Sequence, residues 1–500
     1  MLFRYIVILA LVFTVSGCIT NTDISPDKRV PESDGVVVLR IASNKVGFER
    51  YFKYWKSVRI ESADVSGGSD EYSIGFTPID GNRSAVYIGN LPPGHYRIKT
   101  LYSEPCGTLC VNDTLYVARS FGEFDVRAGR LTYLGHFVYE SAGSSRAVIA
   151  HEIHPDFNDI RQQLIQQYPG IRKYMNKVPL YWDTATVSKN MVSQYNSIRS
   201  HSKGLTGPIE IASGEILFGS LFGILRRWQP GTVPQAIDTG TNRSIEALLE
   251  IKPASWLIGG DGKTLRMTDD SGKSWRALNP DIPYGVILNL EKGLHDDVVL
   301  TLLSGNSVYV FAGRISDRKW KKLYQRELES DYWTGSETAR PGSFRYQDKL
   351  ITVLPSKKGV VVDLGTYAVR DFELPGGMSD FTVTRDGLLR CMCKTFFTAH
   401  AYESRDFGKT WTDSVDDIYM RLPVFLNKSY GVSARTPLLT EKTNIVITTN
   451  GGKVWKSVHT GKQAIYQFLF ANNGRRIIGT NKYDTIIYSD DNGKTWKDGY

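Results

Sequence analysis

The chain has little of what would identify it most directly. Only five of its 500 residues are cysteine, too few for a disulfide-rich scaffold. After residue 18, no apolar stretch approaches the length of a membrane-spanning helix. Lysine and arginine are scattered and form no blocks with interleaved aromatics, so we predict no nucleic-acid partner despite a formal net charge of +9. With 41% apolar residues, the composition fits two or three folded domains.

Metal and cofactor motifs are also lacking. Residues 151–154 (HEIH) do not have the H-E-x-x-H spacing that places two histidine ligands one helical turn apart. Cys391 and Cys393 lie two residues apart in an apolar segment, and the nearest histidine is His400, so no zinc ligand set follows from their spacing. Whether these two cysteines are free or bonded stays open. We predict no metal and no cofactor.

The first 18 residues have the pattern of a secretory signal. A single arginine, Arg4, precedes an apolar run at residues 5–15, which is too short for a membrane span with ordinary flanks. Residues 15–18 (VSGC) resemble the lipobox of bacterial lipoproteins, whose cysteine becomes the lipidated first residue of the mature protein. The resemblance implies lipid on Cys18, a membrane anchor and a cell-envelope location. Because Ile19 and not aspartate follows, it implies the outer membrane in a Gram-negative host. An ordinary cleaved signal is the alternative.

What the chain does have is four copies of one turn motif. They are TDDSGKSW at residues 268–275, SRDFGKTW at 404–411, TTNGGKVW at 448–455 and SDDNGKTW at 489–496. An aspartate that opens a tight turn accepts hydrogen bonds from nearby backbone N–H groups, glycine supplies a positive φ, and tryptophan packs between sheets. We therefore assign structural roles to Asp270, Gly272, Trp275, Asp406, Gly408, Trp411, Asn450, Gly452, Trp455, Asp491, Gly493 and Trp496. Val454 replaces the hydroxyl residue in the third copy, which predicts a looser turn.

The spacing of the motifs sets the number of repeats. The tryptophans of the last three copies are 44 and 41 residues apart, and the first two copies are separated by 136 residues, or three steps of about 45. Periods of 40–50 residues with short strands are typical of propeller blades. We predict seven units at 205–500, and an open stack of hairpins is the alternative. The seven positions are Trp228, Trp275, Trp320, residues 365–367 (GTY), Trp411, Trp455 and Trp496.

The motif resembles the Asp-box (BNR) repeat, S/T-x-D-x-G-x-T/S-W, of sialidases, sortilin-type receptors, xyloglucanases and the photosystem II assembly factor. The resemblance implies a propeller fold more than an activity. Sialidases also carry an R-I-P motif ahead of the first box. Here the nearest match, Arg421-Leu422-Pro423, lies between the second and third boxes, and residues 339–341 (ARP) match less well. Catalytic residues therefore stay unknown, and a sialidase-like glycoside hydrolase is the alternative function.

The first half of the chain predicts a separate small β-sandwich at 36–140. Strand-like runs at 36–41, 84–88, 96–101, 122–126 and 132–137 are separated by turn residues. Residues 90–98 (NLPPGHYRI) resemble a hairpin of prealbumin-like or carboxypeptidase-regulatory-like sandwiches, and residues 126–135 fit the same domain type. Cys106 and Cys110 flank a short loop, where we favour a structural disulfide over a redox pair.

Two connecting segments complete the chain. Residues 19–35 are polar and predict a flexible tether. Residues 141–204 predict a helical linker, with a first helix at 156–174 whose apolar stripe is Phe157, Ile160, Leu164 and Tyr168, and a second at 188–199. We interpret these helices as a docking element, and a partner-binding helix is the alternative.

Together these patterns predict an all-β protein: a seven-bladed β-propeller preceded by a small β-sandwich and a short helical linker. The predicted function is that of a lipid-anchored binding or scaffold protein of the cell envelope. Its predicted partners are the membrane, through Cys18, and a protein or glycan.

The lipid anchor is directly testable. Replacing Cys18 with serine removes the only thiol at the predicted cleavage point, so we expect the Cys18→Ser variant to leave the membrane fraction when cells are fractionated. The control is the unchanged chain, which should stay with the membrane. If Cys18→Ser remains in the membrane fraction in full, the protein has no lipid at this position.

Overall fold

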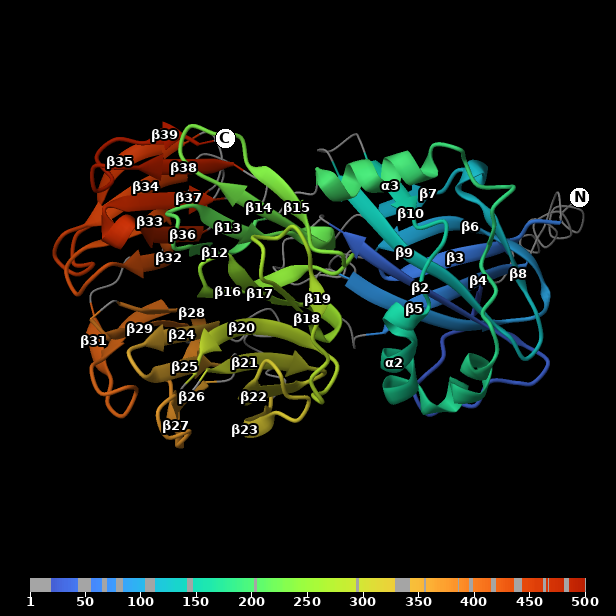
Figure 1. Ribbon diagram of the computed structural model, residues 1–500, viewed down its shortest axis with the longest axis horizontal. Coiled ribbons are helices and arrows are strands. Elements are labelled where there is room, and N and C mark those ends of the chain that lie inside the picture. The colour runs from blue at the N-terminus through green and yellow to red at the C-terminus, as the bar shows by residue number, and fades with distance from the viewer. Residues whose placement is uncertain are drawn as a thin grey trace, which may run out of the picture. The chain divides into compact units, whose positions relative to one another are not determined.

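The computed structural model describes residues 19–43, 55–64, 70–77, 84–103, 113–141, 147–201, 205–293, 296–328, 342–354, 357–384, 386–394, 399–414, 420–435, 443–461, 465, 467–480 and 485–499. The chain divides into two compact units, an N-terminal unit that ends at Ile198 and a propeller unit at Arg199–Tyr500 (Figure 1). Both are mainly β-structure with few helices, as the sequence predicted. Within the described ranges, no helix is both long and apolar enough to cross a membrane.

Eleven strands form the sheet of the N-terminal unit. Their order is β10-β9-β2-β5-β4-β3-β6-β8-β11, with β1 beside β4 and β7 beside β6. Strand β4 links two halves of this sheet, because its first residues pair with β3 and its last two with β5. The five strands predicted from sequence are found as β2, β5, β6, β8 and β9. The strand bounds are β1 Ile19–Asn21, β2 Gly35–Ser43, β3 Ser57–Ser62, β4 Glu71–Thr77, β5 Ser84–Leu91, β6 Gly94–Ser103, β7 Asp113–Tyr116, β8 Glu123–Val126, β9 Leu131–Ser141, β10 Ala147–His151 and β11 Trp182–Asp183.

The predicted linker belongs to the core of the N-terminal unit. Helix α2 (Asn158–Gln167) is followed by the 3-10 helix η3 (Pro169–Asn176), and α3 spans Met191–Ser200. The predicted apolar stripe on α2 is buried in one cluster with residues of β2, β5 and β9. Strands β10 and β11 also lie in the segment predicted to be linker. The structure therefore differs from the prediction of a separate linker at 141–204, because α2 buries its apolar face on the sheet of the N-terminal unit and β10 and β11 belong to that sheet.

The segment predicted to be a flexible tether is also ordered. Strand β1 runs parallel to β4 with Ile19 opposite Glu71, and the N–H of Thr22 donates to the carbonyl oxygen of Ser73 at 3.0 Å. Ile24 and Val30 are 2% and 5% exposed. These two apolar side chains enter the core, and this burial accounts for the difference from the predicted tether at 19–35.

The propeller unit consists of seven four-stranded sheets, called sheets 1 to 7 in chain order. In every sheet the strands pair antiparallel in sequence order. Sheet 1 consists of β12 Thr206–Glu210, β13 Ile216–Gly219, β14 Ile224–Trp228 and β15 Gln235–Asp238. Sheet 2 consists of β16 Ile245–Lys252, β17 Ser255–Gly260, β18 Thr264–Thr268 and β19 Arg276–Ala277. Sheet 3 consists of β20 Val286–Lys292, β21 Asp297–Ser304, β22 Ser307–Arg314 and β23 Lys321–Glu327. Sheets 4 to 7 are β24 Gly342–Tyr346, β25 Lys349–Val353, β26 Lys358–Asp363, β27 Val369–Glu373; β28 Gly377–Val383, β29 Leu389–Lys394, β30 Ala399–Ser404, β31 Thr412–Ser414; β32 Met420–Phe425, β33 Gly431–Arg435, β34 Thr443–Thr448, β35 Lys456–Gly461; β36 Gln467–Ala471, β37 Arg476–Thr480, β38 Ile486–Ser489, β39 Lys497–Asp498.

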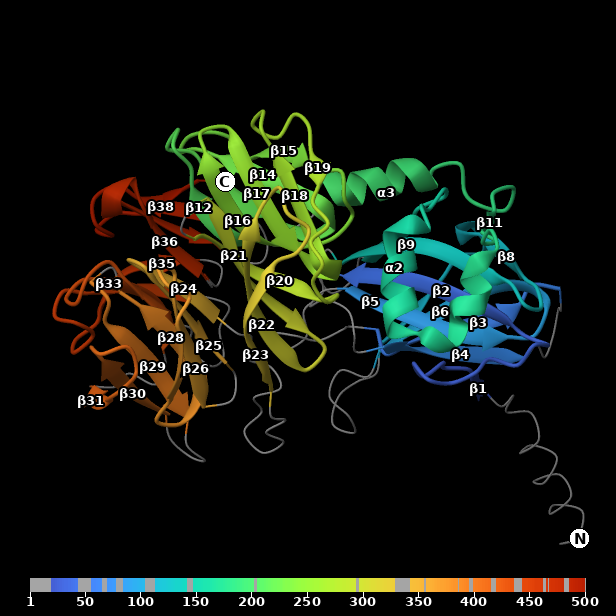
Figure 2. The same cartoon turned by 60° about the horizontal axis from the view of Figure 1, so that its bottom comes forward.

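These sheets are arranged in a ring. The first strand of each sheet lies next to the first strand of the following sheet, and β12 of sheet 1 contacts β36 of sheet 7 (Figures 1 and 2). Sheets placed around a closed ring with their first strands innermost form a β-propeller, which leaves no inner sheet edge unprotected.

The ring is closed by packing between its first and last sheets. Trp228, at the end of β14, is 1% exposed and lies in a cluster that contains residues of sheets 1 and 7. Its indole Nε1 donates to the carbonyl oxygen of Gly499 at 3.2 Å, and its ring lies 5.8 Å from that of Tyr488. Because all four strands of each sheet come from one continuous segment, no strand exchange joins the ends. Side-chain packing at Trp228 therefore contributes directly to closure.

Truncating Trp228 tests this role. Loss of a buried tryptophan side chain costs about 3–5 kcal/mol in a core, so we expect Trp228→Ala to lower the free energy of unfolding of the propeller unit by that amount. Val454→Ala is the control, because Val454 is 65% exposed. Scanning calorimetry of the full chain measures both. A Trp228→Ala transition at the temperature of the control would show that closure does not depend on this side chain.

Candidate functional site

Each Asp box is the turn between the third and fourth strands of its sheet. In sheet 7, Asp491 Oδ1 accepts from the N–H of Thr495 at 2.9 Å and from Ser489 Oγ at 2.8 Å. Its Oδ2 accepts from Thr495 Oγ1 at 2.6 Å. Gly493, at φ 75°, donates its N–H to Ser489 Oγ at 2.8 Å and accepts from the indole of Trp496 at 3.0 Å. The aspartate and the glycine thus close this turn, and the tryptophan donates a hydrogen bond to it.

The other three boxes repeat this geometry. Asp270 and Asp406 accept from the N–H and the hydroxyl of the residue four positions later, with all four distances between 2.5 and 2.9 Å. In the third box, Asn450 Oδ1 accepts from the N–H of Val454, also at 2.9 Å. Since valine has no hydroxyl, this turn lacks one side-chain bond, while its backbone bond has the same length as in the other boxes. The looser turn predicted from sequence is limited to that one bond.

Hydrogen bonding keeps the box carboxylates ionised. It lowers the pKa of Asp270, mainly through the hydroxyl of Ser274, to about 2. The pKa of Asp406 falls to about 2 through the N–H of Thr410, and that of Asp491 to about 2 through the hydroxyl of Thr495. A carboxylate that is ionised and bonded to its own turn is poorly suited to act as a general acid near neutral pH. The boxes therefore provide rigidity.

The fourth residue of three boxes is also tied to the preceding sheet. In each box this residue has a positive φ. The carbonyl oxygen of Phe407 accepts from Arg370 Nη2 at 2.6 Å, and that of Asn492 accepts from the hydroxyl of Tyr430 at 2.7 Å. In the third box, the carbonyl oxygen of Gly451 accepts from Arg390, whose guanidinium lies 3.9 Å from the ring centre of Phe425. We call these three contacts the box ties.

The turns without a box use other side chains at the same place. In sheet 3, the indole of Trp320 donates to the carbonyl oxygen of Asp317 at 3.1 Å, as Trp496 does within its box. In sheet 4, Asp363 Oδ1 accepts from the N–H groups of Gly365 and Thr366 at 2.9 and 2.8 Å. The hydroxyl of Tyr367 donates to a carboxylate oxygen of Asp297 in sheet 3 at 2.6 Å.

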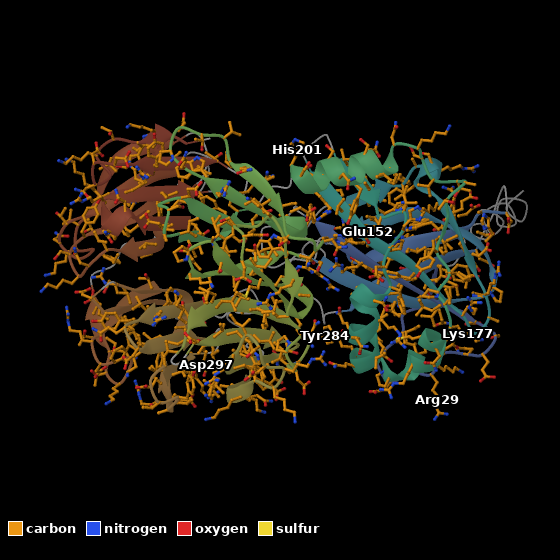
Figure 3. All side chains as sticks on the ribbon, viewed as in Figure 1. Arg29, Glu152, Lys177, His201, Tyr284 and Asp297 are labelled. Carbon is orange, nitrogen blue, oxygen red and sulfur yellow. The ribbon has the colours of Figure 1, made fainter. Side chains whose placement is uncertain are left out.

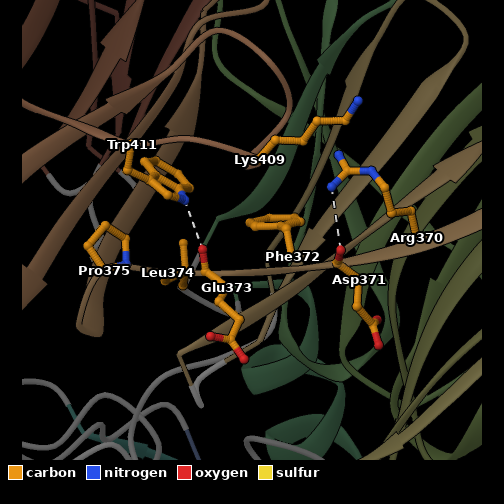
Figure 4. A pocket seen from close by; sticks show the side chains of 9 residues that line it. Arg370, Asp371, Phe372, Glu373, Leu374, Pro375, Lys409 and Trp411 are labelled. Carbon is orange, nitrogen blue, oxygen red and sulfur yellow. Dashed lines mark hydrogen bonds between the residues drawn. The ribbon is translucent and has the colours of Figure 1, made fainter.

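A groove of about 530 Å³ lies between sheets 4 and 5 (Figure 4). Phe372, 5% exposed, packs beneath it, and its ring lies 6.4 Å from that of Trp411. The indole of Trp411 donates to the carbonyl oxygen of Glu373 at 2.8 Å and not to its own box glycine. The lining residues are Arg370, Asp371, Phe372, Glu373, Leu374, Pro375, Gly408, Lys409 and Trp411. An aromatic wall with charges of both signs at its rim suits a ligand that has one flat apolar face and several polar groups.

A second groove has the same construction between sheets 2 and 3. It has a volume of about 230 Å³ and is likewise built from a fourth strand, the leucine and proline that follow it, and the next sheet's turn. Its lining residues are Arg276, Ala277, Leu278, Asn279, Pro280, Ile315, Ser316, Asp317, Arg318 and Trp320. Neither groove is evident from the sequence, because its two walls come from different repeats. The recurring Leu-Pro or Leu-Asn-Pro after the fourth strand is the signal that both share.

The cysteines and the R-I-P-like motif can be placed only in part. Cys391 is in a disulfide and 1% exposed, which settles for this residue what the sequence left open. Cys18, Cys106 and Cys110 lie outside the described residues, as do residues 339–341. The side chains of Arg421 and Cys393 are likewise outside the description.

The HEIH segment does not form a metal centre. His151 is fully buried, its two ring nitrogens lie 2.8 Å from the carbonyl oxygen of Glu152 and 2.6 Å from that of Phe121, and burial lowers its pKa. Its ring stacks on Trp182 with a centroid distance of 4.2 Å. Among the described residues, no group of three or more histidine, cysteine, aspartate or glutamate side chains is placed to hold a metal ion.

Comparisons with known proteins agree with the repeat. Residues 487–498 match the BNR/Asp-box repeat family. No curated protein sequence matches the chain. A structure of YCF48 bound to D1 peptide is 13% identical, covers 57% of this chain and 93% of its own, and has a TM-score of 0.45. YCF48 from Cyanidioschyzon merolae (12%, 57% and 95%, TM-score 0.43) and a streptogramin B lyase (12%, 58% and 94%, TM-score 0.44) are similar to the same extent.

The lowered pKa values of the box aspartates predict an acid-sensitive stability. A carboxylate with a pKa of about 2 in the folded protein and 3.8 without its partners stabilises the fold above about pH 4, and this contribution is lost as the pH falls toward 2. We expect the triple variant Asp270→Asn, Asp406→Asn, Asp491→Asn to keep the Oδ1 acceptors, as Asn450 does, and to lose stability less steeply in acid. Urea unfolding at several pH values measures the slope. Equal slopes for both proteins would contradict this assignment.

Proposed function

We propose that the protein is a lipid-anchored scaffold of the cell envelope, whose seven sheets are the seven blades of one propeller. In this proposal the propeller binds a protein or glycan partner, and the N-terminal unit is a β-sandwich module close to the anchor at Cys18. The observation that carries the binding role is the groove between sheets 4 and 5, with Trp411 and Phe372 as its aromatic part and Lys409 at its rim.

Rigidity supports this role. Binding loses less conformational entropy when the contacting side chains are held in place beforehand. Here both groove walls are fixed: Arg370 is bonded to the box of sheet 5, and Trp411 is bonded to the backbone of sheet 4. The side chain of Lys409 is exposed at the rim, where it can contact a partner without breaking a structural bond.

The sialidase-like alternative has less support. The box carboxylates that the structure describes are held by their own turns, so they do not supply an acid and base pair. The motif that suggested the alternative depends on Arg421, whose side chain is outside the description. No further observation favours hydrolysis, so we propose binding.

Site-specific crosslinking tests the groove. Lys409 and Lys494 occupy the same position in two boxes, and both are exposed, but only Lys409 lines the groove between sheets 4 and 5. We expect a photoreactive residue at position 409 to capture a defined envelope protein or glycan that excess unmodified protein displaces. The same residue at position 494 should not capture it.

Two outcomes would contradict the proposal. Equal capture at positions 409 and 494 would show that the groove is not the binding site. Turnover of a fluorogenic sialoside by the purified chain, abolished by replacing one acidic or tyrosine side chain, would favour the hydrolase. The second assay is independent of any lipid, so it separates the function of the propeller from that of the anchor.

A further inference from the structure

Three segments of the N-terminal unit come together at one surface. The first loop is residues 26–34, the second loop is residues 127–130, and the third loop is residues 170–178, which include most of η3. We call their combined surface the basic face. Gly170 packs so closely on the first loop that a Cβ there would lie 2.5 Å from the carbonyl oxygen of Lys28. Arg130 Nη2 donates to the carbonyl oxygen of Val178 at 2.5 Å, which joins the second loop to the third. The N–H of Gly129 donates to the carbonyl oxygen of Asp34 at 3.0 Å, which joins the second loop to the first.

The basic face has an excess of positive charge. Its loops contain three acidic residues, Asp27, Glu32 and Asp34, and seven basic ones. Glu32 pairs with Lys173 at 3.1 Å, and Asp34 accepts from the side chain of Asn90 at 2.6 Å. Asp125, just before the second loop, pairs with Arg127 at 3.1 Å, so the net formal charge of this surface is +3. The cations are Lys28, Arg29, Arg127, Arg130, Arg172, Lys173 and Lys177, and all but Arg130 are exposed.

Two features of the basic face, its exposed cations and an exposed aliphatic side chain, indicate the kind of partner that it would bind. Figure 3 shows Arg29 and Lys177 projecting from the N-terminal unit into solvent. Beside Lys177, the side chain of Val178 is 75% exposed although it is aliphatic. Cations next to an exposed aliphatic group match a lipid surface, where the charges meet anionic headgroups and the apolar group enters the interface.

The position of the basic face along the chain is also compatible with a lipid surface. Strand β1 begins at Ile19, one residue after Cys18, and it is paired with β4 from that first residue. Nine residues separate Ile19 from Lys28, so these residues are at most roughly 30 Å apart. Ile24, between them, is buried in one cluster with Ile171 and Tyr174 of η3. The segment between Ile19 and the basic face is therefore folded onto the N-terminal unit, so a lipid on Cys18 would limit how far this unit can move from the bilayer.

We infer that the basic face docks on an anionic lipid surface and fixes how the N-terminal unit lies on the membrane. The inference about orientation rests on the proposed anchor at Cys18, but the attraction of the face for anionic lipid does not. An acidic glycan would also meet the charges. Lipid is favoured because the face exposes the aliphatic side chain of Val178 among its cations.

Vesicle binding tests the inference with protein that carries no lipid. The chain from Ile19 onward contains every described element and is mixed with vesicles of phosphatidylcholine, with or without phosphatidylglycerol, at low and at physiological salt. We expect co-sedimentation only with phosphatidylglycerol and weaker binding at higher salt. Two neutralised cations should reduce partitioning roughly 30-fold, so the test variant is Arg29→Ala with Lys177→Ala. The matched control is Lys453→Ala with Lys494→Ala, which removes the same charge from exposed propeller residues.

The outcomes are distinct. Loss of binding in the test variant and retention in the control support the inference. Equal loss in both, or no loss in either, would overturn it, because binding would then follow total charge or another surface. Binding to an acidic polysaccharide that is as tight as binding to the vesicles, and as dependent on Arg29 and Lys177, would also overturn the assignment to lipid. Since no acyl chain is present, none of these results depends on whether Cys18 is modified in cells.

Discussion

The propeller depends on the contact between each turn that joins the third and fourth strands and the sheet before it. A four-stranded sheet built from one continuous segment has no shared strand to hold it to its neighbours. The groups that make this contact differ from sheet to sheet. They are made by Trp228 with Gly499, Gly272 with Ile237, Arg318 with Asp281, Tyr367 with Asp297, Phe407 with Arg370, Gly451 with Arg390 and Asn492 with Tyr430. What they share is that each contact joins a sheet to the one before it in the ring, and for sheet 1 that sheet is sheet 7.

Because each turn is also held by the preceding sheet, the residues of a box can vary from one repeat to another. Within a box, the backbone bonds close the turn, and a neighbouring side chain then holds it from outside. In the third box the hydroxyl is missing, yet Asn450 still accepts from the N–H of Val454 and Arg390 bonds to Gly451. In sheet 4 the whole box is absent, and its turn contacts the preceding sheet through the hydroxyl of Tyr367. A repeat can lose its motif without losing its place in the ring, and it is then recognisable from sequence only by spacing.

The predictability of each element follows from how local its interactions are. The box turns are determined within eight residues, so the sequence predicted their hydrogen bonds. The stripe on α2 was predicted because helical periodicity is also local, whereas the surface it packs on was not. The sequence predicts a tether before β2 because Ile24 and Val30 are isolated among polar residues. Their burial depends on η3, about 140 residues later in the chain. The groove between sheets 4 and 5 was missed for the same reason, since its two walls come from different repeats.

The distribution of charge shows the same limit. Along the sequence, lysine and arginine are scattered, which is why no basic block was found. In the fold, residues near positions 28, 129 and 173 form one surface, because η3 packs on the first loop and Arg130 reaches the third. Conversely, the lysines at one position of four boxes look alike in sequence, but their surroundings differ because the preceding sheet differs. Lys409 lies against a groove that the fourth strand of sheet 4 completes. The chemistry available at a repeated residue of the propeller is therefore set by the sheet that precedes its repeat.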